Sequence, residues 1–182
     1  MAVLADSYIG AAPSTADYGV WTGYRIPDDR SSWHPAVRRF YEYWRSVAPA
    51  GRLPGRQHIR PEDIVPLLPR VFILDVFRDP FRLWYRLAGT EVIRSVQCEL
   101  TGRWVDEVQP ETLTRPGLLD RYRFIVETGE PTWRRGPTLW SRDPKHYLTE
   151  NCLVPLASDG KTVDKIFAVT VMFDASGREL DL

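Results

Sequence analysis

Residues 71–104 read VFILDVFRDPFRLWYRLAGTEVIRSVQCELTGRW, and this stretch decides the fold. Two runs within it, 71–77 and 81–87, are rich in β-branched and aromatic residues and predict two strands. They flank Asp79-Pro80, a dipeptide that favours turns, so the two strands are expected to form an antiparallel hairpin. The stretch therefore predicts the first hairpin of an antiparallel sheet.

The second run of this hairpin alternates between apolar and polar side chains, which is typical of a strand with one buried face. The alternation assigns four side chains to that buried face: Phe81, Leu83, Tyr85 and Leu87. The intervening side chains are expected to face solvent or a covering helix.

Short helices are predicted on both sides of the hairpin. Gly89-Thr90 ends the second strand and offers an N-cap for a helix over residues 91–97. On the other side, residues 61–68 (PEDIVPLL) place a proline and two acids in a first turn, which suits the positive end of a short helix. Helices beside an antiparallel sheet indicate the α+β class.

An amphipathic helix is predicted over residues 33–47. Ser32 is its expected cap, and Pro35 lies in its first turn. Four apolar side chains recur at helical spacing and form one stripe: Val37, Phe40, Tyr41 and Trp44. The stripe either packs on the sheet of its own domain or serves as the contact surface for a second subunit or a partner, and the pattern leaves both alternatives open.

The second half of the chain predicts one longer helix. It runs from a cap at Thr114, with Pro116 in its first turn, to a terminating Gly129. Its apolar face consists of Leu118, Leu119, Tyr122, Ile125 and Val126. This face is expected to cover the sheet.

Three β-rich runs close the chain, over residues 132–141, 145–157 and 162–173. Gly136-Pro137 lies in the first of them. Because proline cannot donate to a central ladder, this run is expected to be an edge strand.

Composition indicates a globular chain. The fraction of hydrophobic residues is 43% and that of charged residues is 26%, both ordinary for folded domains. The 24 basic residues balance 24 acidic ones, so no nucleic-acid partner is expected. The N-terminus lacks the features of a signal peptide and no apolar stretch is long enough to span a bilayer, so we expect no membrane partner and a cytoplasmic location.

The length of 182 residues suits one domain with extensions. We expect that domain over residues 32–176, a short tail over 177–182, and a partly irregular arm over 1–31. Three aromatic side chains are expected to dock the arm: Tyr18, Trp21 and Tyr24.

Five sequence motifs in order resemble a family of short, single-domain bacterial PAS-like proteins. They are HPAVRRFYEYW at 34–44, LLPRVFILDV at 67–76, YRLAGTEV at 85–92, ELTGRWVDE at 99–107 and VPLASDGKTVDKI at 154–166. The resemblance implies a five-stranded antiparallel sheet in the order 2-1-5-4-3, with helices over one face and an N-terminal amphipathic helix. That order puts the strand with Pro137 on an edge, in agreement with the proline argument.

The resemblance also implies a small-molecule pocket between the sheet and its helices. It places five candidate ligand-binding residues near that pocket: Tyr85, Leu87, Ile93, Trp104 and Tyr122. The alternative is that these side chains simply fill the core, as large apolar side chains usually do. Arg86 and Arg94 would reach an anionic ligand if they turned inward, and would otherwise lie at the surface.

No catalytic, metal or cofactor site is expected. The sequence has no GxSxG elbow, glycine-rich phosphate loop or HExxH motif, so an enzyme is not expected. Cys98 and Cys152 match no zinc or redox spacing and are expected to be free thiols, and the neighbours of Cys98 differ from those of the reactive cysteine in flavin photosensors. A haem would need an axial ligand such as histidine, and we expect the three histidines, His34, His58 and His146, to provide none.

The predicted function is a non-catalytic sensory or regulatory module that binds an unknown small molecule. Because only residues 174–182 follow the last predicted strand, the signal is expected to pass in trans to a signalling protein, and the helix over 33–47 is the expected contact for a homodimer or partner. The alternative is a pure interaction or dimerisation module with a filled pocket. A cavity of several hundred cubic ångströms would favour the sensor, whereas a filled interior would count against ligand sensing.

Overall fold

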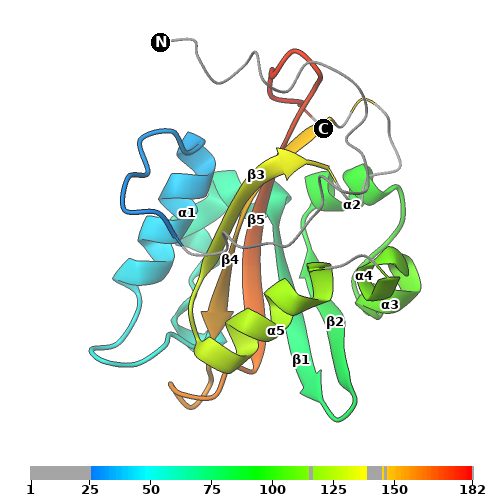
Figure 1. Cartoon of the computed structure of the whole chain (residues 1–182). Helices are drawn as coiled ribbons and strands as arrows, with labels where there is room; N and C mark the ends of the chain where they lie inside the picture. The colour runs from blue at the N-terminus through cyan, green and yellow to red at the C-terminus, as the bar shows by residue number, and fades with distance from the viewer. Residues whose placement is uncertain (1–25, 115–116, 139–144, 146, 182) are drawn as a thin grey trace.

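The computed structural model describes residues 26–114, 117–138, 145 and 147–181, which form a central sheet between two layers of helices (Figure 1). The elements, in which η denotes a 3-10 helix, are α1 (Pro35–Ser46), η1 (Arg56–His58), η2 (Pro61–Arg70), β1 (Val71–Arg78), β2 (Phe81–Ala88), α2 (Thr90–Val96), α3 (Val105–Val108), α4 (Glu111–Thr114), α5 (Leu118–Thr128), β3 (Thr132–Pro137), β4 (Leu148–Leu156) and β5 (Lys165–Phe173). Over this described part of the chain, no helix is both long and apolar enough to cross a membrane.

The sheet has the order β2-β1-β5-β4-β3, and every neighbouring pair is antiparallel. The PAS-like order 2-1-5-4-3 is therefore confirmed. β3 lies at one edge and ends at Pro137, where the missing N–H removes no bond from a central ladder. The edge position predicted from this proline is confirmed.

The N-cap of α1 lies two residues later than predicted. His34 is the N-cap, and its Nδ1 accepts a hydrogen bond from the backbone N–H of Ala36 (3.2 Å). Pro35 is the first residue of the helix, a position that needs no N–H and suits the fixed φ of proline. The prediction of Ser32 as the cap is wrong, because the cap directly precedes the proline.

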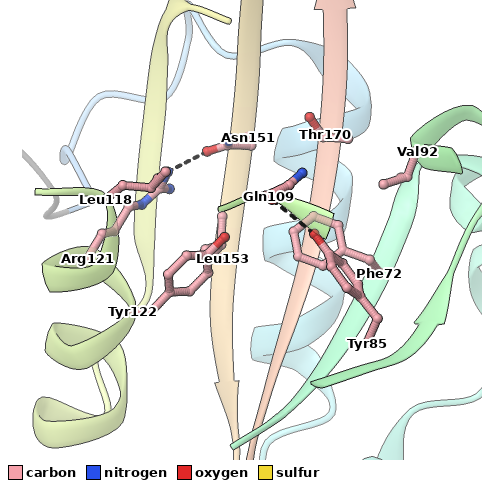
Figure 2. A pocket seen from close by; sticks show the side chains of 10 residues that line it. All are labelled: Phe72, Tyr85, Val92, Gln109, Leu118, Arg121, Tyr122, Asn151, Leu153 and Thr170. Atoms are coloured by element: carbon pink, nitrogen blue, oxygen red, sulfur yellow. Dashed lines mark hydrogen bonds between the residues drawn. The ribbon is translucent and has the colours of Figure 1, made fainter. Parts of the chain in front are cut away.

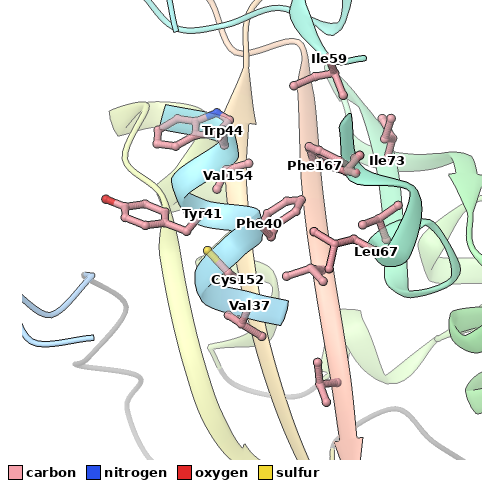
Figure 3. Close-up of a cluster of buried hydrophobic side chains, with 14 of the residues drawn as sticks. Val37, Phe40, Tyr41, Trp44, Ile59, Leu67, Ile73, Cys152, Val154 and Phe167 are labelled. Carbon is pink, nitrogen blue, oxygen red and sulfur yellow. The ribbon is translucent and has the colours of Figure 1, made fainter. Parts of the chain in front are cut away.

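The apolar stripe of α1 packs on the protein's own sheet. Val37, Phe40, Tyr41 and Trp44 are each at most 8% exposed, and they lie against β4 and β5 (Figure 3). The rings of Phe40 and Phe167 meet edge to face, with centroids 4.6 Å apart. The prediction of these four side chains as a dimer or partner surface does not hold, because their own sheet already buries them.

The opposite face of the sheet is covered by α2, α3 and α5. Their apolar side chains and those of the sheet form a second core cluster, consisting of Phe72, Leu74, Leu83, Tyr85, Val92, Val96, Leu100, Val105, Val108, Leu118, Tyr122, Ile125, Leu153, Ile166 and Ala168. The sheet is thus covered on both faces: by α1 and η2 on the face called here the α1 face, and by α2 to α5 on the face called the α5 face.

A β-bulge in the first hairpin changes the direction of Leu87. Leu74 lies opposite Tyr85, but the preceding residue Ile73 lies opposite Leu87, so Arg86 is an extra residue on β2. Because side chains alternate with a period of two, the extra residue moves Leu87 to the α1 face, where it is 41% exposed. The prediction that Leu87 shares a face with Tyr85 is wrong for this reason.

The helix predicted from a cap at Thr114 to Gly129 begins later than expected, because Thr114 is the last residue of the short helix α4 and α5 begins at Leu118. α5 starts after Gly117 and ends at Gly129, and both glycines have a positive φ, at 80° and 69°. The predicted stop at Gly129 is confirmed. Pro116 and His146 lie outside the described residues, as does the arm over residues 1–25 with its three aromatic side chains.

Candidate functional site

A small cavity lies between the sheet and the helices of the α5 face (Figure 2). Its volume is about 20 Å³, which is room for about one water molecule and is far below the several hundred cubic ångströms expected for an open sensor pocket. The side chains that line it are Phe72, Tyr85, Val92, Gln109, Leu118, Arg121, Tyr122, Asn151, Leu153 and Thr170. They come from β1, β2, β4, β5, α2, α5 and the segment between α3 and α4.

The register of the central strands brings two polar side chains to this cavity. Asn151 of β4 lies directly opposite Thr170 of β5. Directly opposed residues in an antiparallel pair project to the same face, so both side chains point to the α5 face. Their neighbours Cys152 and Val169 belong to the core of the α1 face, as the alternation requires.

α5 adds a buried arginine from its first turn. Arg121 is only 3% exposed, and its Nη1 donates to Asn151 Oδ1 (2.7 Å). Its Nε donates to Thr132 Oγ1 (2.9 Å), so the guanidinium joins α5 to both β4 and β3. Of the ten side chains that line the cavity, Arg121 is the charged one. The cavity therefore has a positive charge beside it in a region of low dielectric.

Two more polar groups reach the cavity. The Tyr85 hydroxyl donates to Gln109 Oε1 (3.3 Å), which ties the segment between α3 and α4 to β2. Thr170 Oγ1 is buried and has no hydrogen-bond partner among the described residues. A buried hydroxyl without a partner costs about 1–3 kcal/mol, so it marks a place where a ligand or a water has something to bind.

Both tyrosines at the cavity are neutral hydrogen-bond donors. Burial raises the pKa of Tyr85 well above its ordinary value. Burial also raises the pKa of Tyr122, although the neighbouring Arg121 opposes this change. At neutral pH both hydroxyls therefore keep their protons.

Two of the five predicted ligand-binding residues line the cavity, namely Tyr85 and Tyr122. Ile93 does not, because α2 turns Val92 inward and leaves Ile93 half-buried beside it. Leu87 points to the other face of the sheet because of the bulge.

Trp104, the fifth, lies outside the cavity. It is the N-cap of α3 and sits beside edge strand β2, where its ring meets those of Trp84 and Phe77 at centroid distances of 4.9 and 5.0 Å. The guanidinium of Arg82 stacks on the Trp104 ring at 3.9 Å. We call Phe77, Trp84 and Trp104 the aromatic cluster.

The sequence patterns missed Gln109, Arg121, Asn151 and Thr170. One signal for Arg121 was present: it lies three residues after Leu118 and four before Ile125, on the apolar face of the helix. A charged residue in such a stripe indicates a buried charge with a specific role.

The arginines considered for an anion lie elsewhere. Arg86 is exposed, and its Nε donates to Asp75 Oδ2 (2.7 Å). Arg94 is exposed on α2. Of the two alternatives for Arg86 and Arg94, the surface position therefore holds, and the arginine that lines the cavity is Arg121.

Neither of the two described histidines lines the cavity. His34 caps α1 on the opposite face of the sheet, and His58 Nδ1 accepts from the backbone N–H of Gly55 (2.9 Å). Cys98 and Cys152 are free thiols. Within residues 26–114, 117–138, 145 and 147–181, no three His, Cys, Asp or Glu side chains are grouped to hold a metal.

Comparison with known proteins gives a match to a family model and matches to solved structures. A family model described as a PAS domain matches residues 32–118. No curated protein matches the chain. Among four matching chains of solved structures is an RNA-binding light-oxygen-voltage receptor, with 17% sequence identity and a TM-score of 0.44. The match covers 72% of this chain and 38% of that one, so this chain spans less than half of the receptor's length.

Proposed function

We propose that this protein is a non-catalytic sensor that binds a small molecule in the cavity on the α5 face. The match of residues 32–118 to a PAS-domain model supports this proposal, since PAS domains are sensory and regulatory modules. We further propose that ligand binding is passed on to a protein partner. The cavity lies where the helices of the α5 face meet the sheet, so a ligand there touches both layers.

The single observation that carries this proposal is the set of polar side chains buried at the cavity. Arg121, Asn151 and Thr170 are each 3% exposed. Apolar side chains at these positions would fill the same space without the cost of burying a charge and a hydroxyl that has no partner in the described part of the chain. Polar groups kept at such a cost are typical of a recognition site.

The size of the cavity determines how a ligand must enter. A volume of about 20 Å³ admits a water but not a metabolite, so the helical layer has to move. α3 and α4 are four residues each, and such short helices depend on their packing rather than on their own stability. They are therefore the parts of the layer that a ligand displaces most easily.

The same movement gives the signal a route out of the domain. Gln109, between α3 and α4, touches the cavity, while Trp104 starts α3 and packs in the aromatic cluster. A displaced α3 changes the position of Trp104 relative to Trp84 and Phe77. We propose that this cluster, in which Phe77 is 47% exposed, contacts the partner.

The experiment is a small-molecule screen by ligand-observed NMR, combined with native mass spectrometry of the protein purified from its own host. Each hit is tested again on Val92→Phe, which fills the cavity, and on Val65→Phe, a control at a 57% exposed position. We expect hits to bind the control and not the filled variant, while both variants keep their circular dichroism spectra. Equal binding to both variants, or no ligand by either method, contradicts the proposal.

A second candidate function is a pure interaction or dimerisation module. The small volume of the cavity, which holds about one water, favours it, and so does the exposure of Phe77 in the aromatic cluster. This module would bind its partner equally well with the cavity filled. Light scattering of wild type, Val92→Phe and Phe77→Ser distinguishes the candidates for a homodimer: dimerisation that survives Val92→Phe but not Phe77→Ser supports the interaction module.

A further inference from the structure

The uncharged polar side chains at the cavity keep hydrogen-bond donors available, whereas their carbonyl oxygens already accept bonds. We propose that the ligand is a small uncharged molecule that carries a carbonyl oxygen, such as a ketone, an ester or a lactone, on a compact apolar body. This inference rests on the proposed function, since it names the ligand class of the same site. Four lining side chains carry it: Gln109, Tyr122, Asn151 and Thr170.

The two amide side chains present their nitrogens as donors. Asn151 Oδ1 accepts from Arg121 Nη1 (2.7 Å), and Gln109 Oε1 accepts from the Tyr85 hydroxyl (3.3 Å). The amide nitrogens of Asn151 and Gln109 make no hydrogen bond within the part of the chain that the structure describes. Because an amide nitrogen donates and does not accept, these two groups suit an acceptor on the ligand.

The hydroxyl of Thr170 adds a donor beside Asn151. Thr170 is 3% exposed, and its Oγ1 is buried without a partner among the described residues. The two residues lie directly opposite each other on β5 and β4, and Figure 2 shows them level with each other on adjacent strands. Opposed Cβ atoms are about 4.5–5.5 Å apart, so both side chains are able to donate to one oxygen. A carbonyl oxygen has two lone pairs and accepts two such bonds.

Tyr122 contributes a donor from the helical layer. Its ring comes from α5 and lines the same cavity, and its hydroxyl makes no hydrogen bond to another described residue. Burial raises the pKa of Tyr122, so the hydroxyl keeps its proton at neutral pH. A carbonyl compound held by Tyr122 and by Thr170 would therefore join α5 to the sheet.

The state of the one lining charge argues against an ionic ligand. Arg121 is committed to the protein: its Nε and Nη2 donate to the side chain and backbone oxygens of Thr132, and its Nη1 donates to Asn151. An anion would have to displace these bonds, and the other nine lining side chains carry no charge to balance an ion. The apolar part of the lining, which includes Phe72 and Leu153, suits a body of a few carbons or a single ring.

The test uses three probes of nearly the same shape. Acetophenone carries a carbonyl oxygen, α-methylstyrene has a methylene group in its place, and benzoate has a charged oxygen in place of the methyl group. Titrations followed by protein NMR at pH 7 are expected to show acetophenone at the cavity and benzoate at least about tenfold weaker. The greater hydrophobicity of α-methylstyrene adds affinity of its own, so this probe is compared across variants.

Two variants each remove one hydroxyl and keep the shape of the side chain: Thr170→Val and Tyr122→Phe. Each is expected to weaken acetophenone binding about threefold to tenfold and to leave α-methylstyrene binding within about twofold. Neither hydroxyl has a partner among the described residues, so circular dichroism spectra should not change. Tyr41→Phe is the matched control, since it removes a hydroxyl on the α1 face and should leave both affinities unchanged.

The outcomes separate this inference from the proposed function. If Thr170→Val and Tyr122→Phe do not change acetophenone binding relative to α-methylstyrene, or if benzoate binds as tightly as acetophenone, the carbonyl inference is overturned while the sensor proposal stands. If the probes do not bind, the same variants are applied to the hits of the wider screen, and hits without a carbonyl oxygen overturn the inference alone. If that screen finds no ligand that Val92→Phe excludes, both are overturned.

Discussion

The two faces of the sheet bury different kinds of side chain. The α1 face is filled by aromatic and aliphatic groups, with the ring of Phe40 fixed against Phe167 (Figure 3). The α5 face also has an apolar core, but Arg121, Asn151 and Thr170 interrupt it around a cavity (Figure 2). The difference teaches that one layer mainly stabilises the domain while the other keeps costly polar groups at a binding position.

The α1 face also buries one charged side chain, that of Glu150. Glu150 is fully buried there, and its Oε1 accepts from the backbone N–H of His34 (2.8 Å) and from Trp133 Nε1 (3.1 Å). Its Oε2 accepts no hydrogen bond among the described residues but forms an ion pair with Arg135, with Oε2 and Nη1 3.5 Å apart. This carboxylate has protein partners and holds the start of α1 on β4, whereas the hydroxyl of Thr170 has none among the described residues.

The largest effect is expected from Phe40→Ala, which tests the packed face. The ring is fully buried and meets Phe167, so its removal is expected to destabilise the domain by about 3–5 kcal/mol. Urea denaturation measures this change. Val65→Ala, at an exposed position, is the control and is expected to change the free energy of unfolding by less than about 0.5 kcal/mol. Similar values for the two variants would show that α1 is not part of the core.

The second largest loss of stability is expected from Glu150→Ala. It leaves the buried donors of His34 and Trp133 without an acceptor, so a loss of about 2 kcal/mol is expected. Hydrogen exchange of α1 amides shows whether the loss is local to the start of that helix. An unchanged free energy of unfolding would mean that this carboxylate does not hold α1 on the sheet.

Two threonines on the α5 face allow a buried hydroxyl with a hydrogen-bond partner to be compared with one that has none among the described residues. Thr132→Val removes the oxygen that accepts from Arg121 Nε and is expected to cost about 1–2 kcal/mol. Thr170→Val removes a hydroxyl without a described partner, so it is expected to stabilise the protein by about 1 kcal/mol. Thermal and urea unfolding of both variants measure the contrast. Equal losses for the two would show that a bound water already satisfies Thr170.

The smallest effect is expected at the turn between β4 and β5, which belongs to neither face. Backbone N–H groups of Lys161 and Thr162 donate to the Asp159 carboxylate and lower its pKa from 3.8 to about 2. A pKa lowered by folding contributes stability above the unfolded value, and this contribution disappears as the pH falls through about 2. An NMR titration should give this pKa, and Asp159→Asn should flatten the pH dependence of unfolding between pH 4 and 2. A pKa near 3.8 would contradict the turn geometry.

The order of elements and much of their content could be predicted from the sequence. The alternation in β2 up to Tyr85, the stop of α5 at Gly129 and the edge position of Pro137 all follow from local backbone chemistry. These features depend on neighbours within a few residues. The resemblance to PAS-like proteins supplied the strand order, which the structure confirms.

The candidate site was predicted less well, for reasons that lie beyond local sequence. The pairing of Asn151 with Thr170 depends on the register of two long strands, and the sequence of a β-rich run does not determine that register. The bulge at Arg86, which turned Leu87 away, carries no glycine or proline to mark it. Tyr85 and Tyr122 do line the cavity, as expected of large aromatic side chains on buried faces, while their role in binding a ligand stays a prediction.

The sequence by itself therefore determined the five strands and the approximate place of the longer helices, and which stripe of α1 had to be buried. Only the tertiary structure decided what buries it: β4 and β5 of the same domain, and no second subunit, cover Phe40 and its neighbours. The tertiary structure also gathered Arg121, Asn151 and Thr170 around one cavity. The physical reason is that periodicity fixes the face of each element, whereas contact between faces depends on register and layer packing across distant parts of the chain.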